Sequence, residues 1–236
     1  MLEVRNLAFS YSGKKILRDV SFVVSPGEVV SVVGANGVGK TTLLKILATI
    51  AVPDSGTVMM DGADALSRPL RYRRQIGYLP ERIAMYDDMT VKRYLHYRAK
   101  LKGEPSKRVR RRVSEAAELC QIVPFLSEPI RTLSAGLSKR VALADALLLR
   151  PRVLLLDDFL SGLDRNMRET AGSVLSNAAA FSSVVVTGHE IEDFSRWTTR
   201  FLILRDGVVA SSVDATGLEP ETLRERLDTA MKGGDR

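Results

Sequence analysis

A glycine-rich loop between an apolar run and a helical pattern constrains this chain more than any other stretch. The β-branched run Val29–Val33 ends in the loop Gly34–Thr41, which opens onto the helix-like residues Leu43–Leu47. The loop reads G-A-N-G-V-G-K-T, a full match to G-x-x-x-x-G-K-[ST] in the strand-before, helix-after context that the motif requires. Glycines let a backbone wrap closely around a phosphate, and successive N–H groups and the helix N-terminus then face the anion. The loop therefore predicts binding of a nucleoside triphosphate.

Two residues of the loop and one aspartate supply the chemistry that a bound nucleotide requires. Lys40 places a positive charge beside the phosphates, and Thr41 offers a hydroxyl to Mg²⁺. A second apolar run, Val153–Leu156, ends in Asp157. A carboxylate at the carboxyl end of a buried strand beside the loop can hold the Mg²⁺ shell. The sequence thus predicts a nucleotide site with magnesium.

Length and composition limit the class of protein. The chain has 236 residues, enough for one substantial α/β domain or for a core with one inserted subdomain. Its longest apolar runs are far shorter than a membrane span, and Met1–Arg5 shows no signal-peptide pattern. The single cysteine, Cys120, cannot form an internal disulfide, which fits a reducing compartment. We therefore expect a cytoplasmic protein whose association with a membrane is peripheral.

The order of sequence patterns indicates an α/β core with a helical insertion. The first 33 residues carry strand-like runs, with Leu2–Leu7 and Ala8–Tyr11 as separate strands. Helical periodicity dominates from about residue 85 to 149, and strand and helix patterns then alternate. The predicted helices include 64–75, Val91–Leu101, Lys107–Cys120, Leu137–Leu149, 166–180 and a charged helix at Glu219–Met231.

Several more motifs follow one another in the order of a known family. They are Tyr11, Gly34–Thr41, Ile76–Glu81, Leu133–Leu137, Asp157, Ser161–Asp164 and His189. With these stretches in this order, the chain resembles the nucleotide-binding subunit of an ATP-binding cassette (ABC) transporter over roughly residues 1–212. In that family they correspond, in the same order, to the aromatic on adenine, Walker A, the Q-loop, the signature, the Walker B aspartate, the D-loop and the switch histidine. The signature is the specific motif, since Walker motifs occur in many NTPases.

This resemblance implies a fold and a division of the chain. The fold class is α/β: a P-loop NTPase (RecA-like) core with an N-terminal antiparallel β subdomain and an inserted helical subdomain. The ABC ATPase domain would cover 1–212, with its core at 1–84 and 150–212 and its helical subdomain at about 85–149. Residues 213–236 would form a short C-terminal helical tail.

The resemblance also implies a set of site residues. ATP would contact Tyr11, Gly34, Asn36, Gly37, Gly39, Lys40, Thr41, Thr42, Glu81, Ser134, Gly136 and Asp164; Mg²⁺ would be held by Thr41, Asp157 and Glu81; and Lys40, Asp158 and His189 would be catalytic. Two subunits would pair head to tail. Ser134, Gly136 and the helix end after them would then bind the γ-phosphate held by the other subunit, because a helix N-terminus is an anion site.

Three departures from the family pattern affect the expected chemistry. Asp158 stands where the family usually has a glutamate as general base, and its carboxylate is one methylene shorter. A misplacement of about 1 Å can cost on the order of 100-fold in rate, so we expect slow turnover. Glu81 replaces the usual glutamine, and Ala135 and Leu137 replace a glycine and a glutamine of the signature.

The function implied is that of an energy-coupling ATPase. The chain would bind and hydrolyse ATP as a homo- or heterodimer and drive a separate transmembrane permease from the inner face of the cell membrane. Pro80-Glu81 after Ile76–Leu79 is more typical of exporters than of importers. Two alternatives stay open: a soluble ABC-type ATPase that acts on nucleic acid or as a regulator, and a binding-only degenerate subunit of a heterodimer. No nucleic acid is expected, because aromatic and basic residues do not interleave.

Positive charge is concentrated in one part of the chain. The formal net charge is +7, yet Arg68–Arg112 alone holds fifteen Lys or Arg against four Asp or Glu. This basic stretch favours docking to the anionic cytoplasmic leaflet, or it is simply the solvated face of helices.

Overall fold

A ten-stranded sheet runs through the computed structural model, which describes residues 1–188 and 196–232, with backbone alone at 165 and 166. The strands are β1 (Leu2–Tyr11), β2 (Lys14–Val24), β3 (Val29–Val33), β4 (Ser55–Met60), β5 (Ala63–Asp64), β6 (Ile76–Leu79), β7 (Val153–Leu156), β8 (Ser183–Gly188), β9 (Arg200–Arg205) and β10 (Val208–Asp214). The helices are α1 (Lys40–Leu47), α2 (Pro69–Arg73), α3 (Val91–Leu101), α4 (Ser106–Leu119), α5 (Ala135–Leu147), α6 (Arg165–Ala179) and α7 (Pro220–Lys232).

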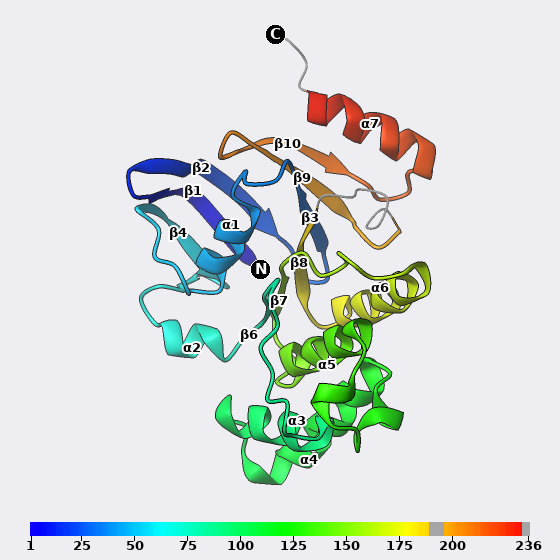
Figure 1. Cartoon of the computed structure of the whole chain (residues 1–236). Helices are drawn as coiled ribbons and strands as arrows, with labels where there is room; N and C mark the ends of the chain where they lie inside the picture. Colours follow the sequence, from blue (N-terminus) through cyan, green and yellow to red (C-terminus); the bar gives the residue numbers. More distant parts are fainter. Residues whose placement is uncertain (189–195, 233–236) are drawn as a thin grey trace.

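The sheet joins an antiparallel part to a parallel part. Its strand order is β5-β4-β1-β2-β10-β9-β3-β8-β7-β6. Strands β9, β3, β8, β7 and β6 pair in parallel, so their carboxyl ends meet at one edge. Figure 1 shows α5 and α6 near β7 and β8, and α3 and α4 beyond α5, away from the N-terminal strands. The α/β class and the antiparallel N-terminal strands are confirmed.

Strand β3 separates two hydrophobic cores. Val30 and Val32 pack into a cluster with α1 and the N-terminal strands, whereas Val29 and Val33 pack into a cluster with α3, α4, α5 and α6. All five residues of the strand are at most 3% exposed. A strand that is buried on both faces reads as a continuous apolar run, which explains the sequence of β3.

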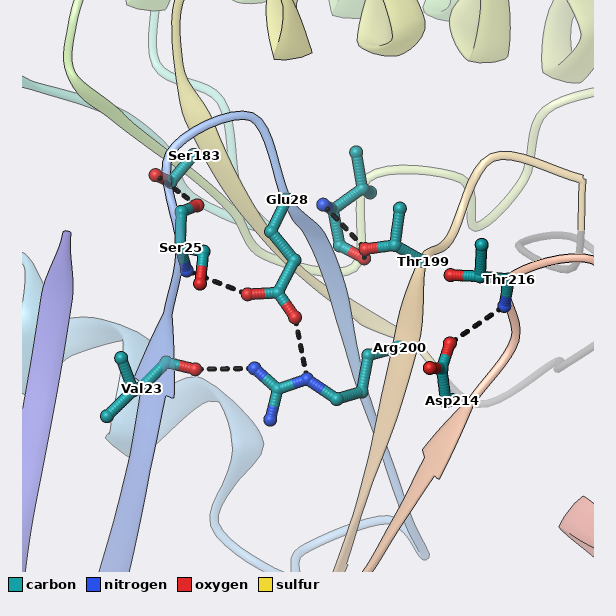
Figure 2. A network of polar contacts seen from close by, with 9 residues as sticks. Val23, Ser25, Glu28, Ser183, Thr199, Arg200, Asp214 and Thr216 are labelled. Atoms are coloured by element: carbon teal, nitrogen blue, oxygen red, sulfur yellow. Dashed lines mark hydrogen bonds and ion pairs between the residues drawn. The ribbon is translucent and has the colours of Figure 1, made fainter.

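A polar network holds the amino end of β3, opposite the glycine-rich loop (Figure 2). Glu28 Oε1 lies 2.6 Å from Arg200 Nε, and Glu28 Oε2 accepts a hydrogen bond from the Ser25 N–H at 2.7 Å. Arg200 also donates to the Val23 carbonyl, which brings β2 into the network. The network therefore ties the amino end of β3 to the first residue of β9 and to the end of β2.

Three predicted elements differ in the structure. Residues 2–11 form one strand rather than two, with an irregularity at Asn6, whose φ is 47°. The helix predicted at 64–75 is wrong over its first half, because Asp64 pairs in β5 and its Oδ1 accepts the Leu66 N–H, a turn that competes with helix; only Pro69–Arg73 is helical. The helix predicted from Leu137 begins earlier, at Ala135.

Between residues 85 and 149 lie the helices α3, α4 and α5 and two short 3-10 helices, Val123–Phe125 and Ile130–Thr132. The division of the chain at these residues stays a prediction. Among the described residues, no helix has the length and apolar composition that crossing a bilayer demands.

Candidate nucleotide-binding site

The glycine-rich loop leaves β3 and enters α1, as its sequence predicts. Gly34 has a φ of 156°, and a Cβ at this position would lie 2.3 Å from the Leu204 carbonyl oxygen of β9. No larger residue fits this close approach of two backbones. Gly39, in a left-handed conformation, is the N-cap of α1, so the free N–H groups of the first turn point toward the loop.

Lys40 lies across the loop that precedes it. Its Nζ donates to the carbonyl oxygens of Gly34 at 2.7 Å and Ala35 at 3.1 Å. Burial lowers the pKa of Lys40, and the negative charges of Asp158 and Asp157 partly oppose that effect. The ammonium therefore sits in a partly dehydrated place between the loop and two carboxylates, where its charge acts strongly on an anion.

Asp157 follows β7 and is 1% exposed. Its Oδ1 accepts two hydrogen bonds, from the hydroxyls of Thr41 at 3.1 Å and Thr187 at 2.8 Å. Burial raises the pKa of Asp157; the two hydroxyls oppose this, and the negative charges of Glu81 and Asp158 add to it. Its other oxygen, Oδ2, is buried and has no hydrogen-bond partner among the described residues.

This unpartnered oxygen is the observation that fits a magnesium ion. A buried carboxylate oxygen without a partner is costly unless a donor or a cation satisfies it. A carboxylate beside a threonine hydroxyl is a set of oxygen ligands that Mg²⁺ prefers, and Mg²⁺ commonly takes only one or two carboxylates beside phosphates and waters. In keeping with such sparse ligation, the described residues contain no group of three or more His, Cys, Asp or Glu placed to hold a metal.

Asp158 lies next in the chain but in another environment. Its backbone is left-handed, with φ at 47°, and its N–H donates to the Thr187 hydroxyl at 3.0 Å. The negative charge of Asp158 acts on two lysines, Lys40 and Lys139, whose pKa values burial lowers. The residue is half-buried and faces the same cavity as Lys40. Asp157 and Asp158 are thus both placed at the loop, in different settings.

A cavity of about 440 Å³ brings most of the predicted site residues together. It is lined by Ile16, Asn36, Gly37, Gly39, Lys40, Thr41, Thr42, Glu81, Asp157, Asp158 and Thr187. Glu81 follows β6; burial, together with the negative charges of Asp157 and Glu81, raises the pKa of neighbouring Tyr78 to about 12. The sequence analysis missed Ile16 and Thr187. The position of Thr187 near the end of a strand parallel to β7 was the available signal.

The other predicted residues lie outside this lining. Tyr11 is 48% exposed, and its ring packs edge-on against Phe9 at 4.7 Å between centroids. Ser134 is the exposed N-cap of α5, where its Oγ accepts the Leu137 N–H at 3.3 Å. Asp164 is the exposed N-cap of α6. His189 lies outside the described residues. The roles of these residues stay predictions.

Gly136, predicted to belong to the signature, is buried rather than open. A Cβ built on Gly136 would lie 2.0 Å from Met167 Sδ, so the Met167 side chain covers this residue. Met167 belongs to the first turn of α6, where its N–H is capped by Asp164 Oδ1 at 2.8 Å. The start of α6 therefore packs directly on the start of α5.

Comparison with known proteins places this site in a family. Residues 17–161 match the family described as ABC transporter. The chain is 32% identical over 212 residues to the spermidine/putrescine import ATP-binding protein PotA of Marinobacter nauticus, covering 89% of this chain and 56% of that protein. It is 31% identical over 210 residues to YxlF of Bacillus subtilis, an uncharacterized ABC transporter ATP-binding protein, covering 89% and 70%. The chain spans about half the length of PotA and of the putrescine transport protein PotG of Escherichia coli, 56% and 45%.

Solved structures agree in fold. The structure of an ATP-binding subunit of an ABC transporter superposes with a TM-score of 0.83 at 26% identity, covering 97% of this chain and 100% of that subunit. A dimeric bacterial ABC transporter cassette, MJ0796, gives a TM-score of 0.82 at 25% identity, covering 92% and 100%. From the family match, the relatives and the fold together, the chain belongs to the ABC transporter family of ATP-binding proteins.

Proposed function

We propose that this chain binds ATP with Mg²⁺ in the cavity at the loop, hydrolyses it as a dimer and thereby drives a separate transmembrane permease. The observation that carries the nucleotide part is the buried, unpartnered Oδ2 of Asp157 beside Thr41 and Lys40. A buried carboxylate oxygen without a partner, next to the glycine-rich loop, supports a bound cation at this position.

Each residue has a distinct part in this proposal. Backbone N–H groups of the loop and Lys40 bind the phosphates, and Thr41 and Asp157, with Glu81, hold Mg²⁺, which neutralises phosphate charge when bound. Asp158 accepts a proton from the attacking water. His189 would contact the γ-phosphate, and Tyr11 would stack on adenine, a contact worth about 1–3 kcal/mol by analogy with other bases.

A single substitution tests the nucleotide site. Lys40→Ala removes the only charge that the loop itself contributes and should abolish measurable ATP binding in an equilibrium titration with MgATP. Lys107→Ala, an exposed lysine on α4, is the matched control and should bind as the parent does. Equal affinity of Lys40→Ala and the parent would remove the basis of the proposal.

The dimer has a test that separates charge from folding. Aspartate and asparagine are both good N-caps, so Ser134→Asp and Ser134→Asn each preserve the start of α5. Only the aspartate sets a negative charge against the γ-phosphate held by the other subunit. We expect MgATP to dimerise the Asn variant and not the Asp variant in light scattering, measured on an Asp158→Asn background to prevent hydrolysis. The exposure of Ser134 supports this arrangement.

The permease is inferred from the relatives and from one surface groove. A groove of about 430 Å³ is lined by Met89, Lys92, Arg93, His96, Tyr97 and Lys100, on α3 and just before it. Its apolar floor and basic rim suit an acidic amphipathic segment of the permease, which would hold this chain peripherally at the cytoplasmic face. The relatives give our expectation of export no support, because PotA is named for import and YxlF for neither direction. Co-purification with a membrane protein, against stimulation of hydrolysis by DNA or RNA, separates transport from the nucleic-acid alternative.

A further inference from the structure

One lysine of α5 contacts the chain segment that carries Asp158. Lys139 Nζ donates to the Phe159 carbonyl at 3.1 Å and also to the Ser161 carbonyl. The Phe159 carbonyl lies one residue beyond Asp158, and the Ser161 carbonyl lies three residues beyond it, at the first residue of the predicted D-loop. The lysine is partly buried there. Its charge interacts favourably with that of Asp158, against the effect of burial, which lowers the Lys139 pKa.

A second contact joins the same two parts of the molecule independently. Met167, in the first turn of α6, covers Gly136 in the first turn of α5. The chain from Asp158 to Met167 is thus fastened to α5 at both of its ends, by an ammonium group near Asp158 and by apolar packing at Met167. Helix α5 starts directly after its N-cap, Ser134, the residue expected to meet the nucleotide of the other subunit.

We propose that Lys139 is a positioning residue for ATP hydrolysis: it holds the Asp158–Ser161 turn against α5, and so fixes the Asp158 carboxylate for its work on the attacking water. This inference rests on the proposed function, in which Asp158 is the general base. It assigns Lys139 no contact with nucleotide, since Lys139 does not line the nucleotide cavity.

The physical argument rests on the local backbone. Asp158 is in the left-handed region, which is costly for a residue with a Cβ and persists only where its surroundings enforce it. The Thr187 hydroxyl accepts a hydrogen bond from the Asp158 N–H, and Lys139 donates to the carbonyls of Phe159 and Ser161 that follow. A shorter carboxylate leaves little tolerance for error in position. Removing the ammonium frees the turn to relax and moves the carboxylate away from the water.

The experiment compares three purified full-length variants. Lys139→Met removes the donors and the charge, Lys139→Arg keeps both, and Lys107→Met is the matched control on an exposed face. We expect kcat of Lys139→Met to fall about 10- to 100-fold, with the KM for ATP and the affinity for MgATP changed less than about twofold. Lys139→Arg should recover most of the lost kcat, and Lys107→Met should match the parent.

A second measurement does not depend on hydrolysis. Amide hydrogen exchange of residues 159–163 without nucleotide should be faster in Lys139→Met than in the parent, while exchange in β3 stays the same. Unchanged exchange together with unchanged kcat would overturn the inference, and so would a loss of kcat matched by an equal loss of ATP affinity. Should Lys139→Met fold poorly, Lys139→Gln, which keeps a donor but loses the charge, takes its place with the same criteria. If the parent itself does not hydrolyse ATP, that result contradicts the proposed function rather than this inference.

Discussion

Asp157 and Asp158 are adjacent in the chain, yet their surroundings suit them to different work. Asp157 is buried at the end of β7, and its Oδ1 accepts hydrogen bonds from two threonine hydroxyls, which leaves Oδ2 for a cation. Asp158 turns into the cavity in a left-handed conformation, with its charge acting on Lys40 and Lys139. Two carboxylates in unlike environments can divide a reaction between metal binding and proton transfer.

From the short side chain of Asp158 we predict how kcat responds to its substitution. Asp158→Glu extends the carboxylate by one methylene toward the water, so kcat should rise, by up to about 100-fold if the present carboxylate is about 1 Å short. Asp158→Asn should lose hydrolysis but keep ATP binding. Steady-state phosphate release at saturating MgATP measures both. A parent that already turns over as fast as Asp158→Glu would contradict the expectation of slow hydrolysis.

Burial of Asp157 predicts a dependence of stability on pH. Its pKa is raised in the folded chain, so between the ordinary Asp pKa and the raised one the native state binds more protons than the unfolded state. The free energy of unfolding therefore falls as pH rises through that window. Asp157→Asn keeps an acceptor for both hydroxyls and has no charge to desolvate. Urea unfolding without magnesium should show the variant gaining stability over the parent from about pH 4 toward neutral pH. A constant difference across this range would contradict the assignment.

The residues of the site were predictable to different degrees. The loop residues and Asp157 occur in local patterns of fixed spacing, so their place in one cavity followed from the sequence. Thr187 and Lys139 belong to no such pattern. They reach Asp157 and the turn after Asp158 only because β8 pairs with β7 and because α5 packs under the start of α6. Contacts made by tertiary packing leave no local signal in a single sequence.

At the scale of elements, an ion cluster joins α3 to the end of α5. Asp145 Oδ2 lies 2.9 Å from Arg98 Nη2, and Oδ1 lies 2.8 Å from Lys102 Nζ. Tyr94, Arg98 and Lys102 recur every four residues, so they share one face of the helix. Burial and the charge of Asp145 raise the pKa of Tyr94, while burial lowers that of Lys102. The cluster therefore holds two cations against one carboxylate.

This imbalance predicts unequal effects of substitution. Asp145→Asn leaves Arg98 and Lys102 without their counter-charge, and should lower the free energy of unfolding by about 3–5 kcal/mol. Lys102→Met leaves the neutral pair of Arg98 and Asp145, so its cost should be much smaller, or stability should rise. Urea unfolding of the two variants in the same buffer measures the difference. Equal destabilisation would show that the second cation is as necessary as the carboxylate.

Element boundaries were predictable where side chains cap them. Thr90, a residue type favoured at helix N-caps, directly precedes the predicted helix Val91–Leu101, and its Oγ1 accepts the Arg93 N–H at 3.3 Å. The strand Val153–Leu156 was also predicted to the residue. The start of α5 was placed two residues too late, because Ala135-Gly136 carries no apolar periodicity although Ser134 caps a helix there. The N-cap Ser134, and not the apolar periodicity, therefore marks where α5 begins.

At the scale of the whole molecule, the basic stretch divides into parts. Arg73 binds the Thr49 hydroxyl and carbonyl, Arg98 and Lys102 bind Asp145, and Arg112 pairs with Glu104 and Glu115, so these four residues support the fold. The remaining charge includes two exposed sets: Lys92, Arg93 and Lys100 at the groove on α3, and Lys107, Arg108 and Arg110 on α4.

Each set includes two cations in the first turn of its helix, where they weaken that helix. Lys92 and Arg93 lie in the first turn of α3, and Lys107 and Arg108 in the first turn of α4, and neither turn has an acidic residue. Positive charge at a helix N-terminus opposes the helix dipole. Replacing these residues with glutamate should therefore preserve or improve folding, and Arg93→Glu even completes a capping box with Thr90. Loss of binding in such variants cannot be attributed to unfolding.

Charge reversal then separates docking to the proposed permease from docking to the anionic leaflet, which the basic stretch favours. Lys92→Glu/Arg93→Glu should abolish co-purification with the permease, because these residues line the groove that we propose binds it. The same variant should bind vesicles containing anionic phospholipid as the parent does. Lys107→Glu/Arg108→Glu/Arg110→Glu should weaken vesicle sedimentation by more than about 100-fold, since each nearby cation contributes about 1 kcal/mol at an anionic leaflet. It should spare the permease complex in detergent. If the α4 variant binds vesicles as the parent does, this part of the basic stretch is a solvated helix face, and the groove alone attaches the chain to the membrane.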